Sequence, residues 1–353
     1  MARIAILGDT HFGARGDSPL FDDHFQQFYE QIFFPYLEKN SIEHVIQLGD
    51  VFDRRKYVNF NTLKRCKKYF FERLNSSYKS WLLVGNHDTF YKNTTKVNSL
   101  DLLLSGYQNI HSICSPFETS FDGTSILFLP WICPENEQEV LDAISLSKSQ
   151  ICCGHFEIQG FEMYKGTVID HGISPSVFNK FELVLSGHYH HKSTKSNITY
   201  CGTPYEMTWS DFDDQKGFHI LDTNTRELEF IPNTLPMFCK IHYNDLDKQM
   251  SDVLVDDFSI YKNCITKVIV TNKTNPYWFD LFIEKLEGSG VSEIQVVDDH
   301  LNLNQEEDED LVNEAEDTLT IVNKYVSQMV VDSNKQDVEN LMRSLYSEAM
   351  TLE

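Results

Sequence analysis

The segment VLSGHYHH, residues 184–191, ends an apolar run in a glycine and a cluster of histidines. Four more apolar runs end in the same way, in a glycine followed at once by a potential metal ligand. The residues that follow the five glycines are Asp9, Asp50, Asn86, His155 and His188. Two of these endings carry a further histidine two residues on, namely His11 and His190. Such repetition within one chain predicts a common site.

The first 231 residues or so alternate between short apolar runs and helical periodicities of three or four residues. We expect strands at 3–7, 44–48, 80–84, 125–129, 149–153, 182–186, 198–201, 217–222 and 227–231. This pattern predicts an α/β fold with helix-covered sheets and antiparallel strands toward its end. Because the carboxyl ends of parallel strands meet at one edge, and glycine permits a sharp turn there, the ligand residues should converge.

The converging donors would be two carboxylates, four imidazoles and one amide, without a thiolate. This set suits two divalent cations that share one carboxylate, with Mn, Fe or Zn as the plausible ions. Two cations about 3.5–4 Å apart activate water and neutralise phosphate oxygens. His191 is expected to face away from the site, because adjacent residues of a turn usually point in different directions. An isolated histidine such as His111 is more simply an ordinary side chain.

The sequence changes in character after Pro236. Apolar runs at 265–271 and 293–297 flank a helical pattern near 276–287, which predicts a small α+β domain. We expect a first domain at 1–235, a small domain at 236–300, an acidic linker at 301–317 and a helical segment at 318–353. The last helix carries an apolar stripe that needs a partner surface and includes Leu341, Leu345 and Tyr346.

The net charge of −23 is unevenly distributed. Residues 54–79 contain nine Lys or Arg and one acid, whereas residues 298–317 contain ten acids and no base. A chain with this balance would bind a nucleic acid weakly by itself, which favours a larger partner. No run approaches the roughly 18 apolar residues of a membrane span. The eight cysteines show no regular spacing and predict reduced thiols in a cytoplasmic protein.

The motifs GDTH, GDVFD, GNHD, GHF and GHYH, in this order, resemble the signature of the calcineurin-like metallophosphoesterases. The segments GTPYEMTWSD and GFEMYKG, with the small domain and the terminal helices, resemble the SbcD-type DNA-break-repair nucleases. The resemblance is strongest to the nuclease subunits of T-even-like bacteriophage recombination complexes. It implies a four-layer α/β/β/α sandwich with a small α+β capping domain and C-terminal partner-binding helices.

The resemblance also implies roles for individual residues. One ion would be held by Asp9, His11, Asp50 and His190. The second ion would be held by Asp50, Asn86, His155 and His188. His87 would act on the scissile phosphate and the leaving oxygen, oriented by Asp53, where cellular relatives commonly have histidine. The implied substrate contacts are Arg54, Tyr164 and Lys165, although an aromatic residue such as Tyr164 more often packs in a core.

The implied activity is that of a manganese-dependent DNA nuclease, an exonuclease on duplex ends and an endonuclease on single strands. It would work with an SbcC-type coiled-coil ATPase in double-strand-break processing, recombination and recombination-dependent replication. The protein would form a homodimer within a heterotetramer, and it would act in the cytoplasm of a bacterial host. Two alternatives stay open. One is a metal-dependent Ser/Thr protein phosphatase or other phosphoesterase, because GDVFDRR resembles that family's motif; the other is a non-catalytic DNA-end-binding scaffold.

Overall fold

Two six-stranded β-sheets dominate the computed structural model, which describes residues 2–164, 167–253 and 257–298. The first sheet has the order β14-β13-β1-β2-β3-β4. Its strands are β1 (Arg3–Leu7), β2 (His44–Gln47), β3 (Lys79–Leu83), β4 (Ile110–Ile113), β13 (Gly217–Asp222) and β14 (Leu228–Pro232). The second sheet has the order β11-β12-β10-β7-β6-β5. Its strands are β5 (Phe117–Phe121), β6 (Thr124–Leu129), β7 (Ile151–His155), β10 (Leu183–Gly187), β11 (Ser193–Lys195) and β12 (Ile198–Tyr200).

Parallel pairing runs through the middle of both sheets. In the first sheet β1, β2, β3 and β4 are parallel neighbours, and in the second sheet β12, β10, β7 and β6 are. Antiparallel strands complete the edges, with β13 beside β1, β11 beside β12 and β5 beside β6. The predicted α/β fold with late antiparallel strands is confirmed. The edge strands β4 and β5 were missed because polar residues interrupt their short apolar runs.

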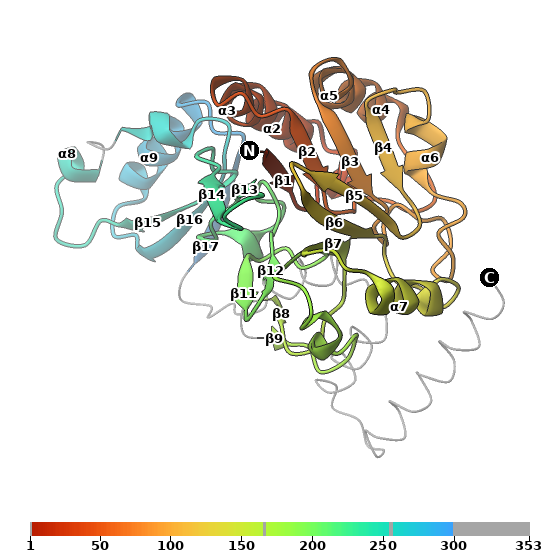
Figure 1. Cartoon of the computed structure of the whole chain (residues 1–353). Helices are drawn as coiled ribbons and strands as arrows, with labels where there is room; N and C mark the ends of the chain where they lie inside the picture. The colour runs from red at the N-terminus through yellow and green to blue at the C-terminus, as the bar shows by residue number, and fades with distance from the viewer. Residues whose placement is uncertain (1, 165–166, 254–256, 299–353) are drawn as a thin grey trace. The chain divides into compact units, whose positions relative to one another are not determined.

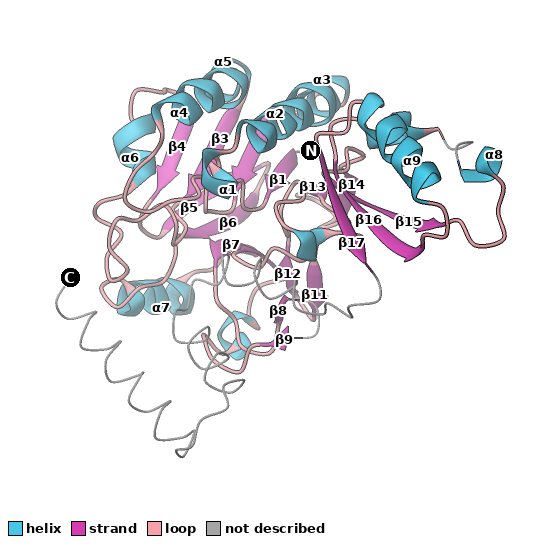
Figure 2. Ribbon diagram, turned by 180° about the vertical axis from the view of Figure 1, so that it is seen from behind, coloured by secondary structure: helices cyan, strands magenta, loops and turns pink. Residues whose placement is uncertain are grey.

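Two long helices cover the outer face of the first sheet, and each contains a π-helical turn (Figure 2). Their parts are α2 (Pro19–Phe28), η1 (Tyr29–Phe33), α3 (Phe34–Lys39), α4 (Phe60–Cys66), η2 (Lys67–Phe71) and α5 (Glu72–Ser77). The phenylalanines at three- or four-residue spacing in α2 are buried, as the periodicity predicts. The rings of Tyr29 and Phe70 lie 4.6 Å apart, so the two π-helical turns are in contact.

The second sheet is covered on its own outer face by α7 (Glu137–Leu146) and η3 (Pro175–Phe178), as Figure 1 shows. The core between the sheets takes inward-facing side chains from both, including Ile6, Ile46, Phe128, Ile151 and Leu185. The four-layer α/β/β/α arrangement is therefore confirmed. The shorter elements are α1 (Ala14–Asp17), α6 (Ser99–Leu104), η4 (Trp209–Asp211), β8 (Glu162–Tyr164) and β9 (Thr167–Val168).

The predicted α+β segment forms a three-stranded sheet of order β15-β16-β17 with its own core. Its elements are β15 (Phe238–Asn244), α8 (Met250–Val253), η5 (Phe258–Tyr261), β16 (Ile265–Asn272), α9 (Pro276–Gly288) and β17 (Glu293–Asp298). α9 begins where the side chain of Asn275 accepts hydrogen bonds from the next turn and Pro276 occupies the first position. The predicted linker and helical segment, at 301–353, lie outside the described residues.

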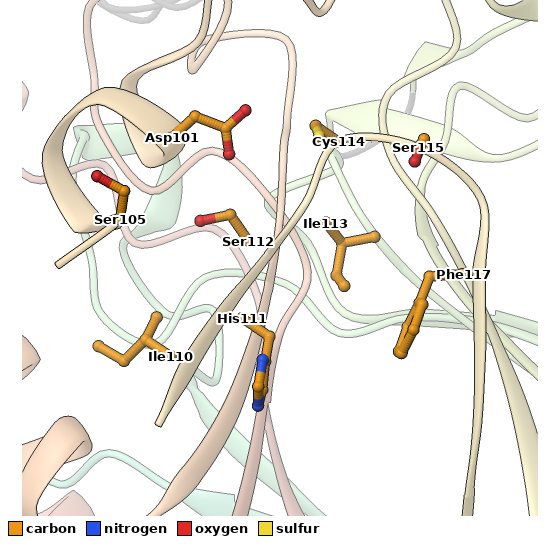
Figure 3. Close-up of a pocket in the computed structure, with 9 residues that line it drawn as sticks. All are labelled: Asp101, Ser105, Ile110, His111, Ser112, Ile113, Cys114, Ser115 and Phe117. Carbon is orange, nitrogen blue, oxygen red and sulfur yellow. The ribbon is translucent and has the colours of Figure 1, made fainter. Parts of the chain in front are cut away.

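Figure 3 shows a pocket beside β4, lined by residues at the end of α6, in β4, in the loop after β4 and at the start of β5. None of the residues predicted to form the metal site lines this pocket, although His111 does. Within the described ranges, no helix combines the length and the apolar character that crossing a membrane requires.

Candidate metal centre

The candidate site lies where parallel strands of both sheets end. Three of its ligand-bearing turns follow β1, β2 and β3 of the first sheet, and the other two belong to β7 and β10 of the second. The structure brings all seven predicted ligands into overlapping groups of nitrogen and oxygen donors. These residues are Asp9, His11, Asp50, Asn86, His155, His188 and His190.

One group of donors surrounds His11. Its Nε2 lies 3.2 Å from Nε2 of His190 and 3.8 Å from Oδ2 of Asp50. The same nitrogen of His190 lies 3.8 Å from Oδ2 of Asp9. This group contains the four residues that the sequence assigns to one ion.

The other group surrounds Asn86. Its Oδ1 lies 2.6 Å from Nε2 of His155 and 3.2 Å from Nδ1 of His188. Nε2 of His155 is 3.3 Å from Oδ2 of Asp50. The four residues assigned to the second ion are therefore together as well.

Asp50 belongs to both groups through a single oxygen. Its Oδ2 faces Nε2 of His11 on one side and Nε2 of His155 on the other. Its Oδ1 accepts a hydrogen bond of 2.8 Å from the main-chain nitrogen of His87, which fixes the orientation of the carboxylate. Asp50 would therefore be shared by both cations, as a bridging carboxylate.

The orientation of His155 provides a test of whether a cation fits. Its Nδ1 lies 2.9 Å from the carbonyl oxygen of Leu48 and donates a hydrogen bond to it. Nε2 then faces the side-chain oxygen of Asn86 at 2.6 Å, so a proton or a cation is required between these two acceptors. Fixing one ring nitrogen so that the other can bind a metal is typical of metal-binding histidines. The donor set fits divalent cations.

The protonation of the buried groups indicates how the site balances its charge without cations. Burial is the largest cause that raises the pKa of Asp9 to about 7, against the opposing effect of His155. Burial would lower the pKa of His155, but Asp50 and Asp9 raise it to about 9. Burial and the neighbouring His11 lower the pKa of His190 well below its usual value. Without cations the site therefore retains protons that metal binding would displace.

The glycines at the five strand ends allow atoms from other segments to approach the backbone closely. This corrects the expectation that these glycines serve mainly to let the chain turn. Among the five, only Gly49 has a positive φ, of 104°. A Cβ on Gly85 would lie 2.2 Å from the main-chain nitrogen and from Oδ1 of Asp50. A Cβ on Gly187 would lie 2.3 Å from Oδ1 of Asp9. These positions exclude a side chain because donor residues from other strands already occupy the space.

The unusual backbone angles fall instead on the donor residues. The φ angles are 41° at His11, 52° at Asp50 and 86° at His188, all in the region that L residues rarely adopt. Such a conformation costs on the order of 1–3 kcal/mol per residue and is concentrated at functional sites. Asp9 supports the turn at His188, whose main-chain nitrogen donates to both carboxylate oxygens at 2.8 and 3.1 Å.

His87 lies beside the first group, with its ring 4.8 Å from that of His11. Its Nδ1 contacts the main-chain carbonyl oxygen of Asp53 at 2.5 Å. The carboxylate of Asp53 lies 3.5 Å from Nδ1 of His11. The sequence predicted support for His87 from the Asp53 carboxylate, and the main-chain carbonyl of Asp53 makes a contact with His87 as well. Burial would raise the pKa of the Asp53 carboxyl, but His11 and, less strongly, His87 lower it.

Two supporting residues were not among the predicted site residues. Asp88 is buried, and its carboxylate accepts hydrogen bonds from the main-chain nitrogens of Gly85, Val51 and Phe52. It therefore holds the turns after β2 and β3 together. Its position inside GNHD predicts that it supports the loop and does not react, and these hydrogen bonds agree with that supporting role.

The second supporting residue is Lys216, which is buried between Asp211 and Asp214. Its Nζ donates a hydrogen bond of 2.9 Å to the carbonyl oxygen of His190. His191 faces this cluster, with Nδ1 2.7 Å from Asp214, and not the metal groups. Asp211 and Asp214 are close to Lys216 in the sequence, but the carbonyl oxygen of His190 comes from a distant turn, and no residue pattern marks that contact.

The remaining predicted residues are the proposed substrate contacts, which do not belong to the two groups of metal ligands. Nη1 of Arg54 donates to Oδ2 of Asp17 at 3.0 Å and to the hydroxyl of Tyr57 at 2.7 Å. Tyr164 lies in β8, and only its backbone is described. Lys165 is outside the described residues.

A layered α/β/β/α fold with nitrogen and oxygen donors around a shared carboxylate defines a metal-dependent phosphoesterase. The chain belongs to the calcineurin-like phosphoesterase family, whose model matches residues 2–192. Along its whole length it is similar to "Exonuclease subunit 1" of Enterobacteria phage T4. The two are 32% identical over 354 residues, which cover 98% of this chain and 99% of the relative.

Two further relatives cover less of the chain. The SbcD component of the nuclease SbcCD from Staphylococcus epidermidis is 24% identical over 65% of this chain and 69% of its own length. "Putative phosphoesterase 078R" of Invertebrate iridescent virus 3 is 24% identical over 57% of this chain and 56% of its own length. The expected resemblance to calcineurin-like metallophosphoesterases and to nuclease subunits is confirmed.

Proposed function

We propose that this protein is a nuclease that hydrolyses DNA phosphodiesters with two divalent metal ions. The observation that carries the proposal is the position of Asp50, whose Oδ2 faces both groups of donors. Two cations held close together by a shared carboxylate would stabilise the attacking and leaving oxygens of an in-line displacement at phosphorus. The names of the relatives, an exonuclease subunit and a nuclease subunit, support DNA as the substrate.

The first ion would be held by Asp9, His11, Asp50 and His190. The second ion would be held by Asp50, Asn86, His155 and His188. We propose Mn²⁺ in both positions, because imidazole and carboxylate donors without thiolate suit it. When bound, the ions would neutralise charge on the phosphate and lower the pKa of an attacking water.

His87 would bind the scissile phosphate and give a proton to the leaving oxygen. Its Nδ1 donates to the carbonyl oxygen of Asp53. Nε2 would contact the substrate. Asp53 would act as a positioning residue through its carbonyl oxygen. Arg54, Tyr164 and Lys165 remain proposed substrate contacts.

The larger assembly is also part of the proposal. The relatives are named as subunits, which supports a partner. We propose an SbcC-type coiled-coil ATPase that binds the segment 318–353 through Leu341, Leu345 and Tyr346, while the small domain at 236–300 shapes the path of the DNA. The nuclease would act as a homodimer within a heterotetramer in the host cytoplasm. It would digest duplex ends and cut single strands during break processing, recombination and replication.

The test is hydrolysis of bis(p-nitrophenyl) phosphate and of end-labelled DNA in MnCl₂. We expect turnover of both substrates, loss of turnover in EDTA and recovery when Mn²⁺ is restored. Turnover of phosphomonoesters far above diesters would favour a phosphatase. Bound ions without any turnover would favour a scaffold.

A further inference from the structure

Three aromatic side chains are exposed on two loops beside the metal centre. The exposed fractions are 61% for Tyr57, 37% for Phe90 and 47% for Tyr91. The rings of Phe90 and Tyr91 lie 4.7 Å apart in an edge-to-face arrangement. Exposing several large rings on neighbouring loops is unfavourable in water unless another molecule covers them.

Both loops are attached directly to the turns that carry the metal donors. Tyr57 follows Asp53, whose carbonyl oxygen contacts His87. Phe90 follows Asp88 at the start of a hairpin-like loop, in which the nitrogen of Phe90 donates to the carbonyl of Val97 at 2.9 Å. A hydrogen bond of 3.2 Å from Arg55 to Thr89 joins the two loops. The rings therefore stand at the edge where β2 and β3 end.

The two loops carry several cations, although Arg54 pairs with Asp17 and Lys96 pairs with Glu135. Residues 54–57 contain three cations and no acid, and residues 89–97 contain two lysines and no acid, against a net charge of −23. The guanidinium of Arg54 lies 5.1 Å from the ring of Tyr57, and that of Arg55 lies 5.5 Å from the ring of Trp131. Cations interleaved with exposed rings are typical of surfaces that bind single-stranded nucleic acid.

We infer that Tyr57, Phe90 and Tyr91 form a stacking platform for the unpaired bases of a single strand whose phosphates contact the neighbouring cations. This inference rests on the proposed nuclease function and names the form of substrate that the site selects. Bases within a duplex already stack on each other, so only unpaired bases can use the rings. A protein partner is the alternative occupant of these rings, and the experiment below distinguishes the two.

The test uses the full chain in EDTA, so that binding is measured without cleavage. Fluorescence anisotropy compares a labelled oligothymidine with a blunt duplex of the same length. Replacing Tyr91 or Phe90 by alanine should weaken single-strand binding by about 5- to 100-fold per ring. Tyr91→Phe, which keeps the ring, should stay within about twofold of the unmodified protein. Leu102→Ala is the matched control, because Leu102 is 70% exposed on α6 and should change nothing.

The inference is overturned if Tyr91→Ala binds oligothymidine as tightly as the unmodified protein, or if duplex affinity falls equally. Loss of binding to a coiled-coil ATPase with unchanged DNA affinity would also overturn it and assign the rings to a protein contact. The two proposals fail separately. If the chain binds single strands through these rings but hydrolyses no diester, the inference stands and the nuclease proposal is wrong. If the chain hydrolyses diesters normally but binds single strands independently of the rings, the nuclease proposal stands and the inference is wrong.

Discussion

Metal affinity should fall steeply as the pH is lowered from 8 to 6, and more steeply at one ion position than at the other. To bind a cation, the carboxyl of Asp9 must be ionised and the imidazole of His155 must be neutral. Each residue must therefore be in its deprotonated form. Because burial and neighbouring charges raise both pKa values, protons compete with the metal at neutral pH. The affinity must therefore rise with pH.

The expected size follows from the two pKa values. With a pKa of about 9, His155 should make affinity at its ion position about 100-fold lower at pH 6 than at pH 8. With a pKa of about 7, Asp9 should make affinity at the other position about 10-fold lower. A histidine with an ordinary pKa of about 6.5 would account for only about a fourfold change.

Isothermal titration calorimetry with MnCl₂, in buffers of different ionisation enthalpy, measures both the affinity and the protons released. His191→Gln is the matched control, because His191 contacts Asp214 and should leave both quantities unchanged. Affinity that changes by less than about fourfold across this pH range, without proton release, would refute the reasoning.

Four further predictions concern single parts of the site. Asp50→Asn should weaken both ions together in calorimetry, since one oxygen serves both donor groups; loss of only one ion would contradict the bridging role. His87→Gln should keep both ions but lower diester turnover by about 10²- to 10⁴-fold, and a collapse of manganese binding would show that His87 is a ligand. Gly85→Ala should lower turnover by about 10²-fold, because its Cβ displaces Asp50, whereas Gly106→Ala, where a Cβ meets nothing within 4 Å, should be neutral. Deleting 320–353 should abolish ATPase binding in a pull-down while manganese-dependent hydrolysis persists; unchanged binding would be evidence against the proposed docking segment.

Much of the fold was predictable because the middle strands are continuous apolar runs. β1 and β13 fall on the predicted residues, and β10 differs from its prediction by one residue at each end. β4 and β15 were missed for a common reason. Polar residues interrupt the apolar side chains of both segments, so neither contains a continuous apolar run.

The supporting residues of the site were harder to predict than the donors. Lys216 stabilises the turn at His190 through a hydrogen bond to the main-chain carbonyl oxygen of His190. Every residue type has such a carbonyl, so the sequence does not indicate this contact. The same reason explains Asp53, whose carbonyl oxygen contacts His87 while its carboxylate lies beside His11. Contacts made by the main chain depend on where the backbone turns, so they are not encoded by the side chain at that position.

The sequence by itself determined which residues could donate to the ions and in what order they occur. Each of these residues either directly follows a strand-end glycine or lies two residues beyond one that does. Only the tertiary structure decided that Oδ2 of Asp50 faces both donor groups, and that Gly85 and Gly187 are needed for close approach. The physical reason is that these features depend on distances between segments far apart in the chain. Those distances are set by the packing of two sheets against each other, which no local pattern contains.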